Sequence, residues 1–325
     1  MRDVPYGGLR TRLGASVLAT STAMAAVAGL AGSAGADTRS ASAVAAAQPE
    51  SGTAGVRRQL RALEDSYQGR IGAYAIDTGT GTGKTVSYRG GERFAGASTF
   101  KAILCGAILN KARTTDPGLL DRTLRWTAKD VVANSPISGL PENVKNGMTA
   151  DRLCHAAVTA SDNTAANVLL KQIGGPAGLT RYYRSLGDPI GRLDRWEPEL
   201  NDWKPGEKRD TVKPAFMARN LQKLSLGGAL VPEDRQRLND WLRASVTGAE
   251  RIRAGVPRDW IVGDKTGGGI GAYAPGNDIA VAWPPSGAPV IIAIYTNRTD
   301  PAATMDNSVI AKAATVLVRG LGLAK

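Results

Sequence analysis

The chain contains only one histidine and two cysteines among its 325 residues. Zinc sites usually take three or four ligands from His, Cys and carboxylate side chains, so this scarcity excludes most zinc chemistry. The one histidine, His155, stands in the apolar stretch Leu153-Cys154-His155-Ala156-Ala157. There we expect a packed structural residue rather than a catalyst, and we expect no metal or other cofactor.

Acidic residues are also few, 29 against 41 lysines and arginines, which gives a formal net charge of +12. A nucleic-acid-binding domain would concentrate its basic residues and interleave them with aromatics. Here the basic residues are scattered, and aromatic residues make up 5% of the chain. We therefore expect no nucleic acid partner. The charge favours solubility and attracts anionic substrates.

Charged residues are missing altogether from residues 13–36, which are rich in Ala, Gly, Leu and Val. The sequence Ala34-Gly35-Ala36 ends this segment, and a basic start precedes it, made by Arg2, Arg10 and Arg12. This order of features is that of a secretory signal peptide. We predict a signal peptide over residues 1–36 and secretion to the extracellular, periplasmic or cell-wall space.

A membrane anchor is the alternative for the same segment, since its length suffices to span a bilayer. Its many Ala, Gly, Ser and Thr residues make it only mildly apolar, and no cysteine near its end offers a site for a lipid. We therefore expect no stable membrane anchor, while the export route stays open. Residues 37–55 are rich in Ala, Ser, Gln and Gly and are predicted to form a mobile tail.

Hydrophobic patterns predict two ends that contain strands and a helical middle. The amino-terminal end is expected to form a helix over 56–67 and strands over 71–76 and 85–88. The carboxyl-terminal end is expected to form three strands and a last helix, over 260–265, 273–283, 290–296 and 302–318. The middle is mostly helical from 98 to 245, with irregular stretches at 134–147 and 187–210.

The predicted fold class is therefore α/β (α+β). Residues 56–95 and 246–325 are expected to form an α/β subdomain, and residues 96–245 an all-helical one. We expect the active site in the crevice between them, because such junctions are favoured places for ligand sites.

Three short motifs follow one another in the chain: Ser98-Thr99-Phe100-Lys101, Ser161-Asp162-Asn163 and Lys265-Thr266-Gly267. Each is weak alone, because an S-x-x-K occurs by chance roughly once in a chain of this length. All three stand in order, with the segment Arg195-Trp196-Glu197-Pro198-Glu199-Leu200-Asn201 between the second and the third. On these motifs the chain resembles the class A serine β-lactamases across almost its whole mature length.

The resemblance implies an antiparallel five-stranded sheet flanked by helices, beside the all-helical subdomain. It implies a secreted, monomeric enzyme that hydrolyses the β-lactam ring of penicillins and some cephalosporins through a serine acyl-enzyme, giving antibiotic resistance. The implied partner is a small-molecule β-lactam. Two alternatives stay open. A penicillin-binding protein or D,D-peptidase would share the three motifs without the Glu197 loop, and a penicillin sensor would stay acylated.

Acyl transfer needs a nucleophile, a base and donors for the oxyanion. The resemblance makes Ser98 the nucleophile, and a helix that begins there places Lys101 one turn away on the same face. Taken alone, Ser98 could equally be a helix N-cap. Ser161 resembles the serine that passes a proton toward the leaving lactam nitrogen, and Lys265 completes the catalytic set. The base for acylation is either Lys101 or Glu197.

Glu197 is expected to let the acylated enzyme turn over. With Asn201 four residues on, it would hold and activate the hydrolytic water. Both residues lie on an expected Ω-loop over 192–210, whose neck Arg195 and Asp210 would close by a salt bridge.

The resemblance also assigns the contacts to substrate. The backbone N–H groups of Ser98 and Gly268 would form the oxyanion hole, and Asn163 would bind the substrate's side-chain amide. Thr266 would bind the substrate carboxylate, and the rest of the Lys265-Thr266-Gly267 motif would line the same site.

An arginine for the substrate carboxylate is missing from the place where many relatives have it, since residues 268–281 contain none. Arg251 matches the alternative arginine of another branch of the family. Arg253, two residues on, is the other possible register.

Two further features depend on the resemblance. Cys105 and Cys154 match a helix-linking pair of many class A enzymes, and an exported protein can keep such a disulfide; two buried free thiols are the alternative. Asn134 stands where relatives often have an aromatic gatekeeper, so substrate preference is expected to differ. Ala97 and residues 268–271 also lack the cysteine pair typical of the family's carbapenemases.

Overall fold

The computed structural model describes residues 52–79, 83–268 and 271–324. The predicted signal peptide and most of the predicted tail lie outside these ranges. The first helix, α1, spans Thr53–Tyr67, so the predicted tail extends three residues too far. Within the described ranges, every helix is too short or too polar to cross a bilayer.

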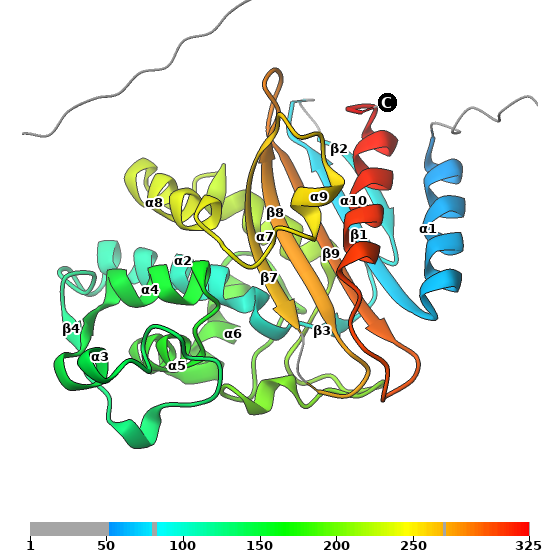
Figure 1. The fold of residues 1–325 in the computed structure, drawn as a ribbon. Helices are drawn as coiled ribbons and strands as arrows, with labels where there is room; N and C mark the ends of the chain where they lie inside the picture. Colours follow the sequence, from blue (N-terminus) through cyan, green and yellow to red (C-terminus); the bar gives the residue numbers. More distant parts are fainter. Residues whose placement is uncertain (1–51, 80–82, 269–270, 325) are drawn as a thin grey trace, which may run out of the picture. The chain divides into compact units, whose positions relative to one another are not determined.

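One antiparallel sheet dominates the fold, with strand order β2-β1-β9-β8-β7 (Figure 1). Its strands are β1 (Gly69–Asp77), β2 (Lys84–Tyr88), β7 (Ile261–Gly268), β8 (Gly276–Trp283) and β9 (Val290–Arg298). Each neighbouring pair is antiparallel. The predicted fold class, a five-stranded antiparallel sheet with flanking helices, is confirmed.

Helices cover both faces of this sheet. The helices α1, α9 (Ile252–Gly255) and α10 (Asn307–Leu321) pack on one face, and α7 (Pro214–Ser225) packs on the other. Strand β9 contributes to the hydrophobic core on each face of the sheet. Ile292 and Ile294 belong to the core that includes residues of α1 and α10, while Ile291 and Tyr295 belong to the core that includes residues of α7. Alternate residues of a strand point to opposite faces, so a strand covered twice reads as one apolar run.

The remaining helices lie together beside the sheet (Figure 1). They are α2 (Phe100–Thr114), α3 (Pro141–Asn146), α4 (Ala150–Thr159), α5 (Asn163–Gln172), α6 (Gly175–Ser185) and α8 (Pro232–Arg243). Two short strand pairs tie in the intervening loops: β3 (Phe94–Ala95) with β6 (Thr211–Val212), and β4 (Thr123–Leu124) with β5 (Met148–Thr149). Helix α2 is buried over most of its length. Each large aliphatic side chain that is fully buried stabilises the folded state by roughly 1.5–3 kcal/mol.

Several element boundaries differ from the sequence predictions. Helix α3 falls in a stretch predicted to be irregular, and it begins with a proline, which favours a first helical turn. Strand β8 starts at Gly276 rather than at Tyr273, because Tyr273 and Ala274 have φ of 65° and 41°, outside the strand region. Helix α10 starts at Asn307, where Asp306 caps it.

His155 is exposed on α4, so the expected packed position is wrong. The buried residues of this helix include its neighbours Cys154 and Ala156. A half-buried helix still points some side chains outward, and in α4 these are Arg152 and His155.

The two cysteines lie in contact across α2 and α4. Both are buried and free, and the Cys105 thiol donates to the Cys154 carbonyl oxygen at 3.7 Å. Burial raises the pKa of the Cys154 thiol well above its usual value, and the Cys105 thiol beside it adds to the rise. The predicted disulfide is therefore not formed in this structure, which has the alternative of two buried thiols. Sequence identifies the pair but does not fix its oxidation state.

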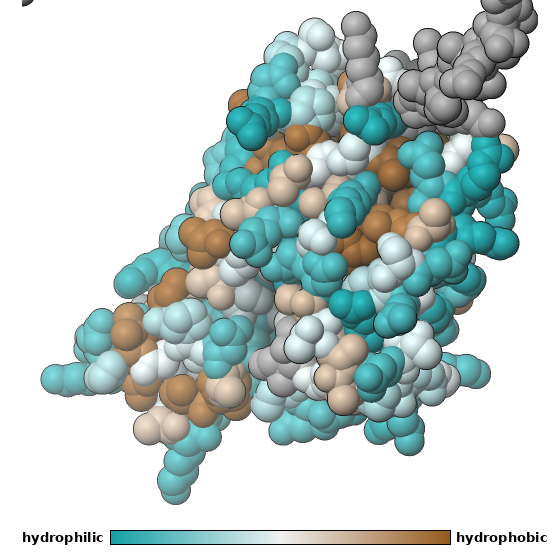
Figure 2. Space-filling view, turned by 45° about the vertical axis from the view of Figure 1, so that its right-hand side comes forward, coloured by the Kyte–Doolittle hydropathy of each residue, from teal (hydrophilic) through white to brown (hydrophobic). Residues whose placement is uncertain are grey.

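The solvent-facing surface mixes hydrophilic residues with small hydrophobic patches on the face that Figure 2 shows. The large hydrophobic side chains that are exposed in the described part of the chain come from separate segments: Leu140, Trp196, Val231, Val246 and Ile261.

Candidate active site

The three motifs and the glutamate segment meet at one cavity between the sheet and the helical part. Ser98 lies in the short helix Ala97–Thr99 that leads into α2, Ser161 lies just before α5, and Lys265 lies in β7. The cavity has a volume of about 190 Å³. Its lining consists of Ser98, Asn134, Ala160, Ser161, Asn163, Asn201, Thr247, Arg251, Thr266, Gly267 and Gly268.

The Lys101 ammonium lies at the centre of this group. It donates to Ser98 Oγ at 2.9 Å, to the Ser161 carbonyl oxygen at 2.7 Å and to Asn163 Oδ1 at 2.5 Å. Its Nζ also lies 3.1 Å from Glu197 Oε1. Burial lowers the pKa of Lys101, and the Glu197 carboxylate opposes that shift.

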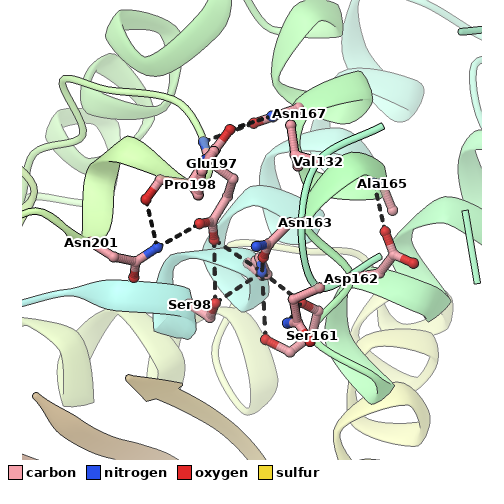
Figure 3. A network of polar contacts seen from close by, with 12 residues as sticks. Ser98, Val132, Ser161, Asp162, Asn163, Ala165, Asn167, Glu197, Pro198 and Asn201 are labelled. Carbon is pink, nitrogen blue, oxygen red and sulfur yellow. Dashed lines mark hydrogen bonds and ion pairs between the residues drawn. The ribbon is translucent and has the colours of Figure 1, made fainter. Parts of the chain in front are cut away.

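Ser98 does not serve as a helix cap, which was its alternative role. Its hydroxyl donates to Glu197 Oε1 at 3.3 Å (Figure 3) and accepts from Lys101 Nζ at 2.9 Å. Neither helix start here has a side-chain cap. Ala97, just before it, has φ of 41°, a conformation that costs a non-glycine residue about 1–3 kcal/mol and marks functional sites. The hydroxyl thus caps no helix, and it lies between the side-chain nitrogen of Lys101 and the carboxylate of Glu197.

Glu197 is buried and its carboxylate is held from two sides. Asn201 Nδ2 donates to Glu197 Oε2 at 2.8 Å, while Oε1 faces Ser98 (Figure 3). The backbone of Glu197 is fixed by Asn167 of α5: Glu197 N donates to Asn167 Oδ1 at 3.0 Å, and Asn167 Nδ2 donates to Glu197 O at 2.9 Å. The Glu197–Pro198 peptide bond is cis. Sequence reasoning missed Asn167, although its position four residues after Asn163 places it on the same helix face.

The neck of the loop is closed by the pair expected from the sequence. Arg195 Nε lies 2.6 Å from Asp210 Oδ2. Asp210 Oδ1 also accepts the backbone N–H groups of Asp194 and Arg195, at 2.7 and 3.0 Å. Because Asp210 is buried, these contacts fix the loop that carries Glu197.

Ser161 stands between the two buried lysines. Lys265 donates to Ser161 Oγ at 2.9 Å, and Lys101 Nζ lies 3.5 Å from the same oxygen. Ser161 has φ of 58°. Burial lowers the pKa of Lys265 well below its usual value, and the positive charge of Lys101 adds to the shift. A chain of hydrogen-bonding groups therefore runs from Lys101 through Ser161 to Lys265.

The two candidate arginines occupy different places. Arg251 lines the cavity, and its Nη1 donates to the carbonyl oxygens of Gly267 and Asn277 at 2.8 and 2.6 Å. Arg253 instead forms an ion pair with buried Asp264 and donates to the Leu242 carbonyl at 3.1 Å. The structure thus brings Arg251, and not Arg253, to the site.

The carboxyl end of β7 forms one wall of the cavity. Thr266 Oγ1 lies 2.7 Å from Thr247 Oγ1, a residue that sequence reasoning missed. Gly268 has φ of 105°, and a Cβ there would lie 1.9 Å from the Pro275 carbonyl oxygen, so only glycine fits. Asn134 also lines the cavity, and its Nδ2 donates to the Ser161 carbonyl oxygen at 3.3 Å.

This arrangement has the parts of a nucleophilic acyl-transfer site. A hydroxyl lies within reach of an amine and a carboxylate, and a second hydroxyl links two lysines. The described ranges contain no cluster of three or more His, Cys, Asp or Glu residues able to hold a metal ion.

Comparison with known proteins gives a consistent result. A model of the "Beta-lactamase enzyme family" matches residues 55–321. Beta-lactamase FAR-1 of Nocardia farcinica (strain IFM 10152) is 49% identical over 263 residues, which are 81% of this chain and 82% of that protein. The carbapenem-hydrolyzing beta-lactamase KPC of Klebsiella oxytoca is 49% identical over 261 residues, 80% of this chain and 87% of its own.

Solved structures agree with the sequence relatives. The crystal structure of a beta-lactamase from Streptosporangium roseum has a TM-score of 0.80 and 58% identity, covering 83% of this chain and 99% of that one. The structure described as "Last common ancestor of Gram-negative bacteria (GNCA4) beta-lactamase class A" has a TM-score of 0.76 and 46% identity, covering 82% of this chain and 99% of that one.

Proposed function

The chain belongs to the class A β-lactamases, serine hydrolases that open the β-lactam ring and so confer antibiotic resistance, and we propose that penicillins, with some cephalosporins, are its substrates. The observation that carries the proposal is the pairing of Ser98 Oγ with Glu197 Oε1 at 3.3 Å. One hydroxyl and one carboxylate at this distance can serve both steps, attack on the lactam and hydrolysis of the ester.

In the first step Ser98 Oγ attacks the lactam carbonyl carbon and the ring C–N bond breaks. Two groups reach the Ser98 proton: the Lys101 amine at 2.9 Å and the Glu197 carboxylate at 3.3 Å. The ring nitrogen receives its proton from Ser161, which Lys265 resupplies over 2.9 Å. The lowered pKa of both lysines supports this relay, because a lysine exchanges protons near neutral pH only when its pKa is depressed.

The developing oxyanion is received by the backbone N–H groups of Ser98 and Gly268. Both residues line the cavity, and the N-terminus of α2 adds its positive partial charge at this point. Removing one such donor from an enzyme site typically costs about 10²–10³-fold in rate.

In the second step a water molecule hydrolyses the acyl-serine ester. Glu197 takes the proton from that water, and Asn201, bonded to Glu197 Oε2 at 2.8 Å, holds the water in line. Arg195 and Asp210 keep the loop in place for this step. A D,D-peptidase or a penicillin sensor would lack such a base, so both alternatives predict a persistent acyl-enzyme.

Substrate is recognised at two ends. The penicillin carboxylate binds Thr266 and Arg251 beside Lys265 and Gly267, a cationic wall that the excess of basic over acidic residues in the chain reinforces. The side-chain amide binds Asn163. The KPC relative is named for carbapenem hydrolysis. This chain lacks the cysteine pair typical of the family's carbapenemases, with alanine at position 97 and no cysteine in residues 268–271, and this supports penicillins over carbapenems.

Turnover of nitrocefin and benzylpenicillin tests the proposal, with Ser98→Ala as the control. We expect multiple turnovers by the wild type and no covalent adduct on Ser98→Ala. A wild type that forms one stoichiometric adduct and stops would indicate a sensor or a D,D-peptidase. Labelled penicillin on Ser98→Ala would show that another residue is the nucleophile.

We further propose that the protein is secreted after removal of residues 1–36 and acts as a monomer. The few large hydrophobic side chains that are exposed in the described ranges come from separate segments. They support a monomer, because the interfaces of stable oligomers are extended and rich in apolar residues. In an oxidising compartment the adjacent thiols of Cys105 and Cys154 are then in place to join. Mass spectrometry of the exported protein tests both the cleavage after Ala36 and the loss of two hydrogens.

A further inference from the structure

The backbone just before Ser98 has an unfavourable conformation that contacts with other parts of the fold maintain. Ala97 has φ of 41°, and such a residue persists only where its surroundings fix it. On one side Gly96 N donates to the Asp210 carbonyl at 2.8 Å, which ties the turn to the Ω-loop. On its other side, the same turn contacts strand β8 of the five-stranded sheet.

Asn277 of β8 makes the connection to the sheet. Its Nδ2 donates to the carbonyl oxygens of Ala95 and Gly96, at 2.9 and 3.2 Å. Its Oδ1 accepts from Thr296 N at 3.3 Å. The side chain is fully buried, so solvent does not compete for these bonds in the intact protein.

The same residue also holds the arginine of the cavity. The Asn277 carbonyl oxygen accepts from Arg251 Nη1 at 2.6 Å, and the same Nη1 donates to Gly267 at 2.8 Å. Asn277 and Gly267 are paired across β8 and β7. A Cβ at Gly267 would lie 3.1 Å from Ser98 N. Asn277 therefore holds both the turn that precedes Ser98 and the side chain of Arg251.

We propose that Asn277 is a positioning residue for acylation: its side chain fixes the turn that aims Ser98, while its main chain fixes Arg251. This inference rests on the proposed function and adds to it a residue that does not line the cavity. The two duties use different groups, so a side-chain substitution alters the turn and leaves the Arg251 contact in place.

Asparagine is the residue type that this position needs. Two carbonyl oxygens face Nδ2, and a backbone N–H faces Oδ1, so one side chain must donate at one end and accept at the other. Aspartate has the same shape but, when ionised, only accepts, and it would set a charge against two carbonyl oxygens. Alanine removes both functions and leaves buried carbonyls without this donor.

The expected consequence is confined to one kinetic step. Displacing a reacting group by about 1 Å can cost on the order of 10²-fold in rate. The turn positions Ser98 Oγ for attack on the lactam and Ser98 N–H for the oxyanion. Ester hydrolysis depends instead on Glu197 and Asn201 of the Ω-loop. Acylation should therefore slow while deacylation does not. Once acylation limits turnover, kcat falls and KM rises toward the dissociation constant of the substrate.

The test compares Asn277→Ala and Asn277→Asp with the wild type, using benzylpenicillin. Stopped flow gives the acylation rate constant, and mass spectrometry of quenched samples gives the decay of the penicilloyl-enzyme. We expect acylation to fall about 10- to 100-fold and deacylation to stay within about twofold. Asn277→Ser keeps a short donor and should recover part of the loss.

The matched control is Asn239→Ala. Asn239 of α8 is also a buried amide that donates to a backbone carbonyl, that of Ser225 at 2.9 Å, but it lies outside the cavity lining. We expect a loss of thermal stability in this variant without a change in either rate constant. Equal slowing of both steps in the Asn277 variants, or slowing in Asn239→Ala, would mean that general destabilisation and not positioning is responsible.

If the Asn277 variants do not fold, Thr99→Val tests the same turn. Thr99 Oγ1 is the other side-chain donor to the Gly96 carbonyl, at 2.7 Å. This variant should slow acylation alone, and unchanged acylation would contradict the proposal. A wild type that acylates without turnover would refute the proposed hydrolysis but leave the role of Asn277 open to the same comparison. A wild type that never acylates would overturn both.

Discussion

Lys101 and Glu197 place their charged groups 3.1 Å apart, and neither side chain is exposed to solvent. Burial favours the neutral amine of Lys101, while the Glu197 carboxylate favours the ammonium. The protonation of Lys101 therefore depends on the charge of Glu197. This dependence offers a way to ask which of the two takes the proton of Ser98.

Replacing Glu197 by Gln should move the pH dependence of acylation to lower pH. The substitution removes the negative charge that raises the pKa of Lys101, so burial acts unopposed and the pKa falls further. A lower pKa leaves more neutral amine at a given pH, and the rising limb of the acylation rate shifts toward acid. Stopped-flow acylation by benzylpenicillin across a pH series measures it. A limb that disappears in Glu197→Gln would assign the proton of Ser98 to Glu197 instead.

Arg251→Ala and Arg253→Ala should separate recognition from stability. Arg251 lines the cavity, and the loss of a charge-assisted hydrogen bond of about 1.5–3 kcal/mol should lower kcat/KM by roughly 10- to 100-fold. Arg253 pairs with buried Asp264, so its removal should lower the free energy of unfolding, by as much as about 3–5 kcal/mol, with a far smaller kinetic effect. Steady-state kinetics and denaturant melts of both variants provide the comparison; the reverse pattern would show that Arg253 binds the substrate carboxylate.

Arg195→Ala should slow deacylation more than acylation. Its ion pair with Asp210, at 2.6 Å, closes the neck of the loop that carries Glu197, and Ser98 and Lys101 lie on other elements. We expect a loss of about 1.5–3 kcal/mol in unfolding free energy and persistence of the acyl-enzyme in mass spectra.

The matched control for this variant is Arg209→Ala on the same loop. Arg209 pairs with Glu207, and its side chain is 54% exposed. Surface ion pairs contribute little, so both rate constants should stay at the wild-type level. If Arg209→Ala matched Arg195→Ala, the loop as a whole and not its neck would be the sensitive feature.

Much of this site could be predicted from the sequence because most of its reactive side chains stand in short motifs. The motifs predict Ser98, Lys101 and Ser161, and in the structure Lys101 contacts both serine hydroxyls. Asn277 could not be found that way. Its partner Ala95 is 182 residues away along the chain, and only the pairing of β8 with the rest of the sheet brings the two into contact.

The errors in the fold have the same origin. Apolar neighbours suggested a packed His155, but the orientation of α4 decides which side chain faces outward. The predicted strand at Tyr273 was too early because its left-handed backbone depends on contacts such as its hydrogen bond to the Pro301 carbonyl at 3.1 Å. Local pattern predicts that an element exists, and tertiary contacts set its limits and its exposed face.

The cysteine pair should be unreactive in the folded, reduced protein. Cys105 and Cys154 are buried, and the raised pKa of Cys154 disfavours its thiolate, the reactive form. Thiol titration should give no reaction before denaturation and two thiols after it. Protein from an oxidising medium should show none, and it should gain at most roughly 4 kcal/mol from a closed loop of about fifty residues. Two thiols in such material would mean that the free pair persists after export.

Glu197→Ala should trap the reaction after its first half. Ser98, Lys101, Ser161 and the oxyanion donors remain, so benzylpenicillin should still form an ester with Ser98. The carboxylate that faces both Ser98 and Asn201 is gone, and loss of a general base costs about 10²–10⁴-fold. Mass spectrometry should show one penicilloyl group that persists long after the wild type has released its own.

Three outcomes are possible for Glu197→Ala, and each assigns the carboxylate differently. A persistent adduct formed at near wild-type rate places Glu197 in deacylation alone and leaves the first proton to Lys101. Slow formation of the adduct gives Glu197 a part in both steps, which its contact with Ser98 Oγ at 3.3 Å allows. Turnover near the wild-type rate would remove Glu197 from the mechanism.

Asn201→Ala serves as the companion variant. It keeps the Glu197 carboxylate but removes the amide that lies 2.8 Å from Oε2. It should therefore slow deacylation less than Glu197→Ala does, and leave acylation unchanged.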